Sequence, residues 1–199
     1  MYKSITEHYD LLAKSGNDPV NDPPPLRDHM DKWDGARFWK LLGADPSLNV
    51  LEIGCGTGRI AVRAAPLVGS YCGIDISPKT IEIARTHIQN ANTRLICDDF
   101  MTHRFTESFD LIFSSLTFLH IKDKAAAVKK VFGLLNNGGR FVLSIDKCQS
   151  NEIDFGAYKV RTYPDDPKMI SELLKLSGFS VVTRDETEYA YLFSALKSI

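Results

Sequence analysis

The segment GCGTG at 54–58 is the feature of the sequence best suited to bind a ligand. It follows an apolar run and precedes a helical pattern, the context that makes a glycine loop meaningful. Glycines allow positive φ angles and close contact between backbone and ligand. Asp75 lies 21 residues after Gly54, where its carboxylate could accept hydrogen bonds from both hydroxyls of a ribose. The spacing predicts a nucleoside site, against the alternative of a tight turn beside a solvated aspartate.

The spacing of the glycines also bears on which nucleoside is bound. A dinucleotide fingerprint has the form G-x-G-x-x-G/A, and counted from Gly54 its third small residue would be Arg59. The sequence contains no Tyr-x-x-x-Lys and no G-x-x-x-x-G-K-[ST] phosphate loop. These observations disfavour hydride transfer with NAD(P), which stays open as an alternative function.

Strand and helix patterns alternate from residue 49 onward, and this alternation would bring the glycine loop and Asp75 together. Such alternation implies right-handed crossovers and a parallel sheet, whose ligands bind beyond the carboxyl ends of the strands. A last pair of strands joined by a short turn predicts one antiparallel strand. The predicted strands are 49–54, 70–75, 93–99, 109–116, 140–146, 179–186 and 188–197, and the predicted helices are 59–67, one that begins at Pro78, 123–135 and 166–177.

Residues 1–46 differ from the rest because prolines divide them. The run Pro23-Pro24-Pro25 cannot lie in a helix interior. We therefore predict a helix over 3–15, a loop over 16–26 and a second helix over 28–43. Together they are expected to form an N-terminal helical cap or lid on a main domain at 47–199.

Composition and charge exclude several classes of protein. Lys and Arg number 24 against 25 Asp and Glu, and this net charge of −1 argues against a nucleic-acid partner. The four cysteines form no C-x-x-C pair, so neither a zinc site nor a disulfide framework is expected. No signal-peptide pattern and no apolar run near the ~20 residues of a membrane span occur. We expect a globular, cytoplasmic protein with no membrane segment.

The run VLEIGCGTG at 50–58 resembles motif I of the class I S-adenosylmethionine-dependent methyltransferases, and the resemblance extends to the C-terminus. It implies a Rossmann-like three-layer α/β sandwich with a seven-stranded, mostly parallel sheet. The implied strand order is 3-2-1-4-5-7-6, with strand 7 antiparallel. It also implies S-adenosyl-L-methionine as methyl donor, S-adenosyl-L-homocysteine as product, and a small-molecule acceptor. The resemblance is strongest to small-molecule enzymes with a short N-terminal cap.

The same resemblance assigns donor contacts to residues that follow the successive strands. It implies a ribose contact for Asp75, an adenine contact for the Asp98 carboxylate, and a place near the methionine end for Glu52. Two structural alternatives are open: Asp98 and Asp99 could cap a helix, and Glu52 could be a buried carboxylate hydrogen-bonded to the glycine loop. The implied donor-binding residues are Tyr9, Glu52, Gly54, Cys55, Gly56, Gly58, Asp75, Ile76, Asp98, Asp99, Phe100, Ser114 and Ser115.

His120 is the candidate general base, because it follows the fourth strand and its unperturbed pKa suits proton transfer. The alternative is a structural histidine that caps the helix over 123–135. A base is needed only where the acceptor must lose a proton, and no ligand spacing suggests a metal. The long connection 147–164 and the cap are expected to select the acceptor.

The predicted function is therefore methyl transfer from S-adenosylmethionine to a small molecule by in-line displacement. The alternatives are an NAD(P)-dependent oxidoreductase and a non-catalytic protein that binds the same donor as a sensor or assembly partner. The sequence decides neither the nucleophilic atom of the acceptor nor the oligomeric state.

Overall fold

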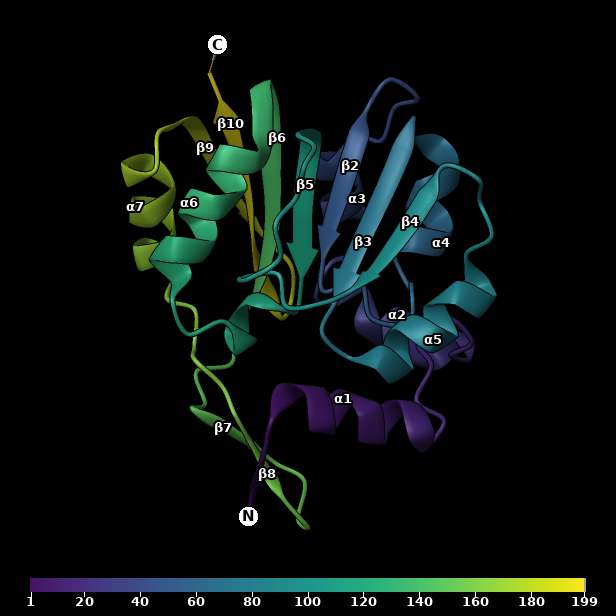
Figure 1. The fold of residues 1–199 in the computed structure, drawn as a ribbon. Helices are drawn as coiled ribbons and strands as arrows, with labels where there is room; N and C mark the ends of the chain where they lie inside the picture. Colours follow the sequence, from purple (N-terminus) through teal and green to yellow (C-terminus); the bar gives the residue numbers. More distant parts are fainter. Residues whose placement is uncertain (199) are drawn as a thin grey trace.

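A seven-stranded sheet runs through the middle of the protein (Figure 1), whose computed structural model describes residues 1–198. The strand order is β4-β3-β2-β5-β6-β10-β9, and β10 runs antiparallel to both of its neighbours. Counted along the chain within this sheet, the order is 3-2-1-4-5-7-6, as the resemblance implied. The strands are β2 (Asn49–Ile53), β3 (Ser70–Asp75), β4 (Thr93–Cys97), β5 (Phe109–Ser115), β6 (Leu135–Asp146), β9 (Phe179–Glu186) and β10 (Ala190–Lys197).

Helices cover both faces of this sheet, which makes the predicted three layers (Figure 1). Helices α6 (Lys124–Leu134) and α7 (Pro167–Leu176) pack on one face. On the other face lie α3 (Gly35–Leu42), α4 (Ala61–Ala64) and α5 (Pro78–His87). Parallel strands covered in this way are buried on both sides, and Val50 and Leu51 of β2 accordingly face opposite clusters of buried side chains.

The N-terminal segment differs from the prediction in how its helices divide. It forms β1 (Tyr2–Lys3), α1 (Ile5–Lys14) and α2 (Pro24–Met30) before α3. The predicted loop over 16–26 and the single helix over 28–43 are wrong, because Pro24 and Pro25 occupy the first turn of α2, where a missing N–H costs nothing. The chain then turns before Gly35, whose φ of 54° starts α3 in a new direction.

The predicted helix over 59–67 is also shorter than expected. It consists of α4 followed by the 3₁₀ turn η1 (Ala65–Leu67), since Pro66 removes a backbone donor. A second 3₁₀ turn, η2 (Phe118–His120), follows β5.

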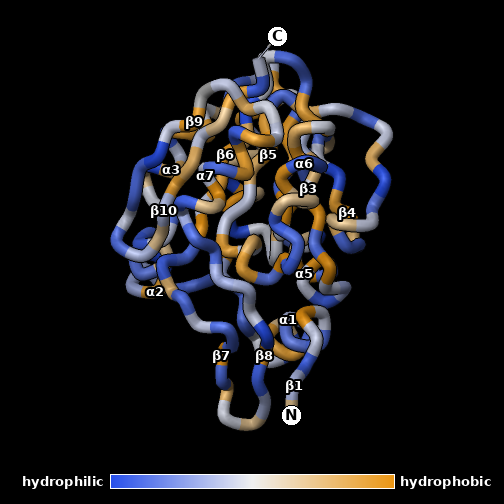
Figure 2. Tube along the Cα trace, turned by 90° about the vertical axis from the view of Figure 1, so that its left-hand side faces the viewer, coloured by the Kyte–Doolittle hydropathy of each residue, from blue (hydrophilic) through white to orange (hydrophobic). Residues whose placement is uncertain are grey.

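The long connection 147–164 is an ordered hairpin rather than a loop. Its strands β7 (Glu152–Asp154) and β8 (Lys159–Arg161) pair with each other, and β1 joins β8 in parallel with Tyr2 opposite Lys159. This small sheet extends beyond the body of the molecule, and α1 lies between it and α5 (Figures 1 and 2). The N-terminus and the hairpin therefore form one unit beside the main sheet.

Within residues 1–198, no helix combines the length and the apolar character that crossing a membrane would require.

The packing of α3 predicts a large stability effect for one side chain. Phe38 is fully buried, and its ring centroid lies 6.0 Å from that of Phe113 on β5. We expect Phe38→Ala to lower the free energy of unfolding by about 3 kcal/mol or more, because it leaves a cavity in the core. The control Leu26→Ala, at a half-exposed position on α2, should change it by less than about 0.5 kcal/mol. Equal effects of the two substitutions in urea denaturation would show that α3 is not part of the core.

Candidate active site

The glycine loop leaves β2 at the carboxyl edge of the sheet. The backbone N–H groups of Gly54 and Cys55 both donate to the carbonyl of Ile74, at 2.8 and 3.1 Å. A β-carbon on Gly54 would collide with the side chain of Thr117, whereas one on Gly56 would face open space. Gly56 has a φ of 53°. Packing therefore requires the first glycine, and the second leaves backbone free for a ligand to approach.

The Asp75 carboxylate joins this loop to the start of α5. One oxygen accepts from the Gly56 N–H at 2.9 Å, and the other accepts from the Ser77 N–H at 2.9 Å and the Thr80 hydroxyl at 3.1 Å. Burial raises the pKa of Asp75, and these donors oppose the rise. Asp75 is thus held at the position where the sequence placed it, with Ile76 half-buried beside it.

The cap is fastened to the same point. Asp10 of α1 accepts from the Ser77 hydroxyl at 2.7 Å and from the Lys79 N–H at 3.1 Å, which caps α5. After α1, Asp18 pairs with His87 at the other end of α5 (2.7 Å). These two carboxylates hold the N-terminal segment along α5.

A buried ion pair that the sequence did not reveal lies over the glycine loop. Asp34, only 1% exposed, accepts from both terminal nitrogens of Arg59 at 2.5 and 3.2 Å. The Ser115 hydroxyl at the end of β5 also donates to Asp34, at 3.1 Å. The only signal for this pair was an arginine where a dinucleotide fingerprint has a small residue, since Asp34 itself follows the pattern of a solvated loop.

Glu52 has a structural partner. Its carboxylate accepts from the Tyr71 hydroxyl on β3, and both side chains are buried. Burial raises the pKa of Glu52 to about 8, although the Tyr71 hydrogen bond and the Arg59 charge act in the opposite direction. The expected structural hydrogen bond therefore exists, but with Tyr71 rather than with the glycine loop.

The segment after β4 reaches the same edge through its backbone. The Asp98 N–H donates to the Asp75 carbonyl at 3.0 Å, and the Asp98 carboxylate pairs with His103 at 2.8 Å. The His103 hydrogen bond lowers the pKa of Asp98. Asp99 caps a single turn through the Met101 N–H, so the alternative of a helix cap is wrong. The Phe100 ring is buried in the core, where it supports this segment.

Tyr9 and His120 form a pair between α1 and η2. The Tyr9 hydroxyl lies 2.8 Å from Nε2 of His120. Burial raises the pKa of Tyr9, and burial together with the charges of His8 and Lys124 lowers the pKa of His120 to about 4. Both side chains are therefore neutral at pH 7. Nδ1 of His120 is buried and has no hydrogen-bond partner among residues 1–198.

The remaining predicted residues lie at the ends of β2 and β5. Cys55 and Ser114 are buried, with the Ser114 hydroxyl donating to the Ile53 carbonyl at 3.0 Å. Burial raises the pKa of the Cys55 thiol well above its usual value. Leu116 next to Ser115 has a φ of 56°, a strained conformation that is found preferentially at functional sites. The predicted residues thus meet at one edge, and their roles in binding stay predictions.

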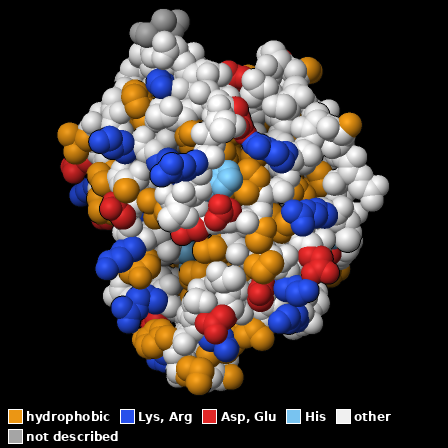
Figure 3. All heavy atoms as spheres, viewed as in Figure 1, with side chains coloured by type: hydrophobic (Ala, Val, Ile, Leu, Met, Phe, Trp, Pro, Cys, Tyr) orange, Lys and Arg blue, Asp and Glu red, His pale blue; other side chains and the backbone are white. Residues whose placement is uncertain are grey.

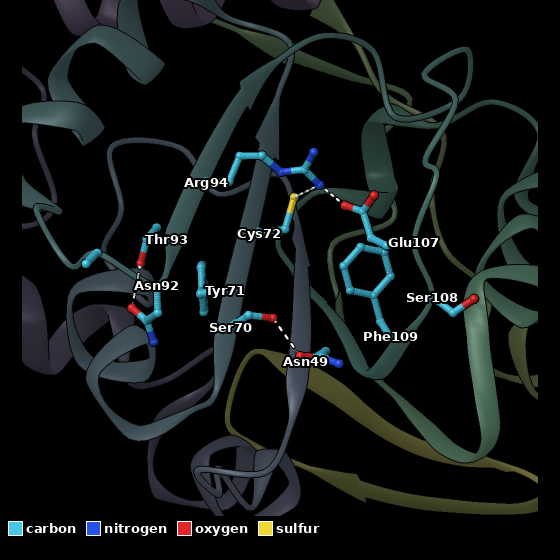
Figure 4. Close-up of a pocket in the computed structure, with 11 residues that line it drawn as sticks. Asn49, Ser70, Tyr71, Cys72, Asn92, Thr93, Arg94, Glu107, Ser108 and Phe109 are labelled. Atoms are coloured by element: carbon cyan, nitrogen blue, oxygen red, sulfur yellow. Dashed lines mark hydrogen bonds and ion pairs between the residues drawn. The ribbon is translucent and has the colours of Figure 1, made fainter.

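A hollow of about 410 Å³ lies at the opposite edge of the sheet (Figure 4). It is open and lined by the first residues of β2 to β5, including Asn49, Tyr71 and Arg94. In parallel sheets ligands bind at the carboxyl ends of strands. This hollow is therefore not the candidate site.

Comparison with known proteins identifies the family. A family model described as a methyltransferase domain matches residues 51–143. Phosphoethanolamine N-methyltransferase 1 of Arabidopsis thaliana is 31% identical over 161 residues, which cover 76% of this chain and 33% of that protein. The chain belongs to the class I S-adenosylmethionine-dependent methyltransferases. The chain spans about a third of the length of the curated relatives that it matches first.

Solved structures of methyltransferases share the fold of this chain. A crystal structure of an S-adenosylmethionine-dependent methyltransferase from Mesorhizobium loti has a TM-score of 0.69 at 19% identity, covering 79% of this chain and 94% of that one. The N-methyltransferase NodS from Bradyrhizobium japonicum, solved with S-adenosyl-L-homocysteine, has a TM-score of 0.69 at 18% identity, covering 96% and 97%. The predicted family and fold class are confirmed, and the predicted donor and enzyme class agree with them.

The environment of His120 predicts how the stability of the protein depends on pH. Its folded pKa of about 4 lies below the ordinary value of 6.5, so the unfolded chain binds the proton more readily. The stabilising contribution is complete above pH 6.5 and is lost as pH falls towards 4, with an upper limit of roughly 3 kcal/mol. Urea denaturation of wild type and His120→Asn should show this slope in the wild type only. Parallel curves for the two proteins would contradict the buried, neutral imidazole.

Proposed function

We propose that this protein transfers a methyl group from S-adenosylmethionine to a nitrogen atom of a small molecule. The observation that carries the proposal is the Tyr9–His120 pair, which stands beside the Asp75 edge in neutral form. Because the Tyr9 hydroxyl can donate to His120, its oxygen can accept a hydrogen bond from an amine N–H and hold the nitrogen towards the methyl group.

The residues at the sheet edge fit the donor. Asp75 would hold the ribose hydroxyls, and the open space at Gly56 would let the nucleoside lie on the backbone. The segment at Asp98 would hold the adenine. Arg59, which follows Gly58 and is partly exposed, would face the carboxylate of the methionine part while it stays paired with Asp34.

When bound, the donor supplies a methyl group on a sulfonium that is already activated for displacement. Displacement would break the carbon–sulfur bond as the carbon–nitrogen bond forms, and the protein would contribute chiefly position and orientation. The nitrogen must attack as the free amine. The Tyr9 oxygen would accept a hydrogen bond from its N–H while the Tyr9 hydroxyl donates to Nε2 of His120, and the methylated ammonium would release its proton to solvent.

Two further observations support nitrogen as the nucleophile. The Arabidopsis relative is named as an N-methyltransferase of phosphoethanolamine, and NodS is an N-methyltransferase. In this protein carboxylates lie at the end of β6 and beyond: Asp146 accepts from the Trp33 indole at 2.9 Å, and Asp165 is buried against Lys124. On the side of the molecule shown in Figure 3, a few acidic and histidine side chains lie near the middle, with Lys and Arg side chains around them. Carboxylates and aromatic rings favour a cationic or amine-bearing acceptor.

The donor site predicts a loss of affinity for Asp75→Ala. The substitution removes an ionised hydrogen-bond acceptor, so the Kd for S-adenosyl-L-homocysteine should rise about tenfold or more in calorimetry. Asp110→Ala is the matched control, because that carboxylate also accepts a backbone N–H (from Asn49, 2.9 Å) but at the opposite edge of the sheet. An unchanged Kd for Asp75→Ala would contradict the ribose role.

The Tyr9–His120 pair predicts a loss of turnover without loss of donor binding. The substrate is first found by incubating the protein with labelled donor and a panel of small amines. Mass analysis of the methylated product then shows which amine is accepted. His120→Asn should then lower kcat by roughly 100-fold, because Tyr9 loses the partner that orients it, while the Kd for S-adenosyl-L-homocysteine stays close to that of the wild type. Tyr9→Phe should lower kcat to a similar extent. An unchanged kcat in both variants would show that the pair has only a structural role.

A further inference from the structure

We infer that Lys130 of α6 is a positioning residue for the adenine of the donor. Its ammonium group holds the segment after β4 in the shape that places the Asp98 carboxylate. The inference rests on the proposed donor site and goes beyond it, because Lys130 lies on a helix that carries none of the donor-binding residues.

The contacts of Lys130 converge on a single short segment. Its Nζ donates to the carbonyls of Phe100, Met101 and His103, at 2.5, 3.2 and 2.6 Å. An ammonium has three donors, and all three are used on four consecutive residues. The same Nζ lies 5.0 Å from the ring centroid of Phe100 and 5.7 Å from that of Phe105, within the range of a cation–π interaction.

These contacts explain how a segment without helix or strand keeps one conformation. Its carbonyls turn inward to Lys130 instead of pairing in a regular element, and buried carbonyls without a donor are costly. No neutral side chain offers three donors from a single atom. Burial lowers the pKa of Lys130 while Asp98 and Asp99 raise it, so the two carboxylates help to keep the ammonium charged.

The link to the donor runs through His103. The carbonyl of His103 accepts from Lys130, and its imidazole pairs with the Asp98 carboxylate at 2.8 Å. The position of Lys130 thus fixes the backbone of His103, and His103 fixes the direction of the carboxylate proposed to receive the adenine amino group. The other Asp98 oxygen accepts from the Asp99 N–H at 2.8 Å. Because the carboxylate is half-exposed, His103 supplies the second contact that sets its direction.

Lys197 provides a matched control elsewhere in the fold. Its Nζ also donates to two carbonyls, of Phe132 and Leu135 at 2.9 and 2.6 Å, and lies 4.8 Å from the Phe132 ring centroid. Lys197 is at the end of β10 and touches no part of the donor edge. Replacing either lysine by methionine should lower the free energy of unfolding. Only Lys130→Met should change the preference of the protein for an adenine over a base that lacks the amino group.

The test compares the affinities of S-adenosyl-L-homocysteine and its inosine analogue, which has a carbonyl in place of the adenine amino group. Wild type should prefer the adenosine compound, and Lys130→Met should reduce this preference by about tenfold, the value of one oriented hydrogen bond to a charged acceptor. Lys130→Arg, which keeps the charge, should retain part of it. Lys197→Met should leave the ratio unchanged.

The outcomes separate the inference from the proposed function. Binding of neither compound to the wild type would overturn both. A wild type that binds S-adenosyl-L-homocysteine and discriminates, with the same ratio in Lys130→Met, would overturn the role of Lys130 alone. If Lys130→Met does not fold, His103→Ala is the second variant, because it removes the partner of Asp98 at a partly exposed position. It should reduce the ratio of the two affinities. An unchanged ratio in His103→Ala would also refute the inference.

Discussion

The Asp75 carboxylate, placed where β2 and β3 end side by side, is the constraint on which the rest of the site depends. It is half-buried, and it accepts backbone N–H groups from the glycine loop and from the start of α5. Because it ties two crossover connections together, it fixes both the loop and the helix. The Asp98 segment joins the same residue through the Asp75 carbonyl. The ends of β2, β3 and β4 are therefore all linked through hydrogen bonds of Asp75.

Around this point two ion pairs join distant parts of the chain. Asp34 of the N-terminal segment meets Arg59 after the glycine loop, and Lys124 of α6 meets Asp165 before α7. Lys124 also donates to the carbonyls of Phe118 and Tyr163, which holds the His120 turn against the hairpin segment. Removing one partner of such a pair leaves an uncompensated charge, so these pairs give the site a single arrangement.

The sequence predicted the elements and site residues that depend on local pattern. It did not predict the contacts between segments that are distant in the chain. The strands, the glycine loop, Asp75 and the neighbourhood of His120 follow from apolar runs and turn residues that act over a few positions. The pairing of Tyr2 with Lys159 and the ion pair of Asp34 with Arg59 join segments whose local sequences resemble solvated loops. Lys130 lies in a helix where a lysine ordinarily faces water. Pro24 and Pro25 were read as breaking a helix, although at its first turn they start one.

The central claim is that a nucleoside lies across the ends of β2 and β3, and a crystal structure with S-adenosyl-L-homocysteine tests it most directly. The account predicts ribose hydroxyls within hydrogen-bond distance of Asp75, the adenine beside Asp98, and the amino-acid end near Arg59 and Asp34. Side chains filling the space over Gly56, or the ligand bound at the amino ends of the strands instead, would contradict it.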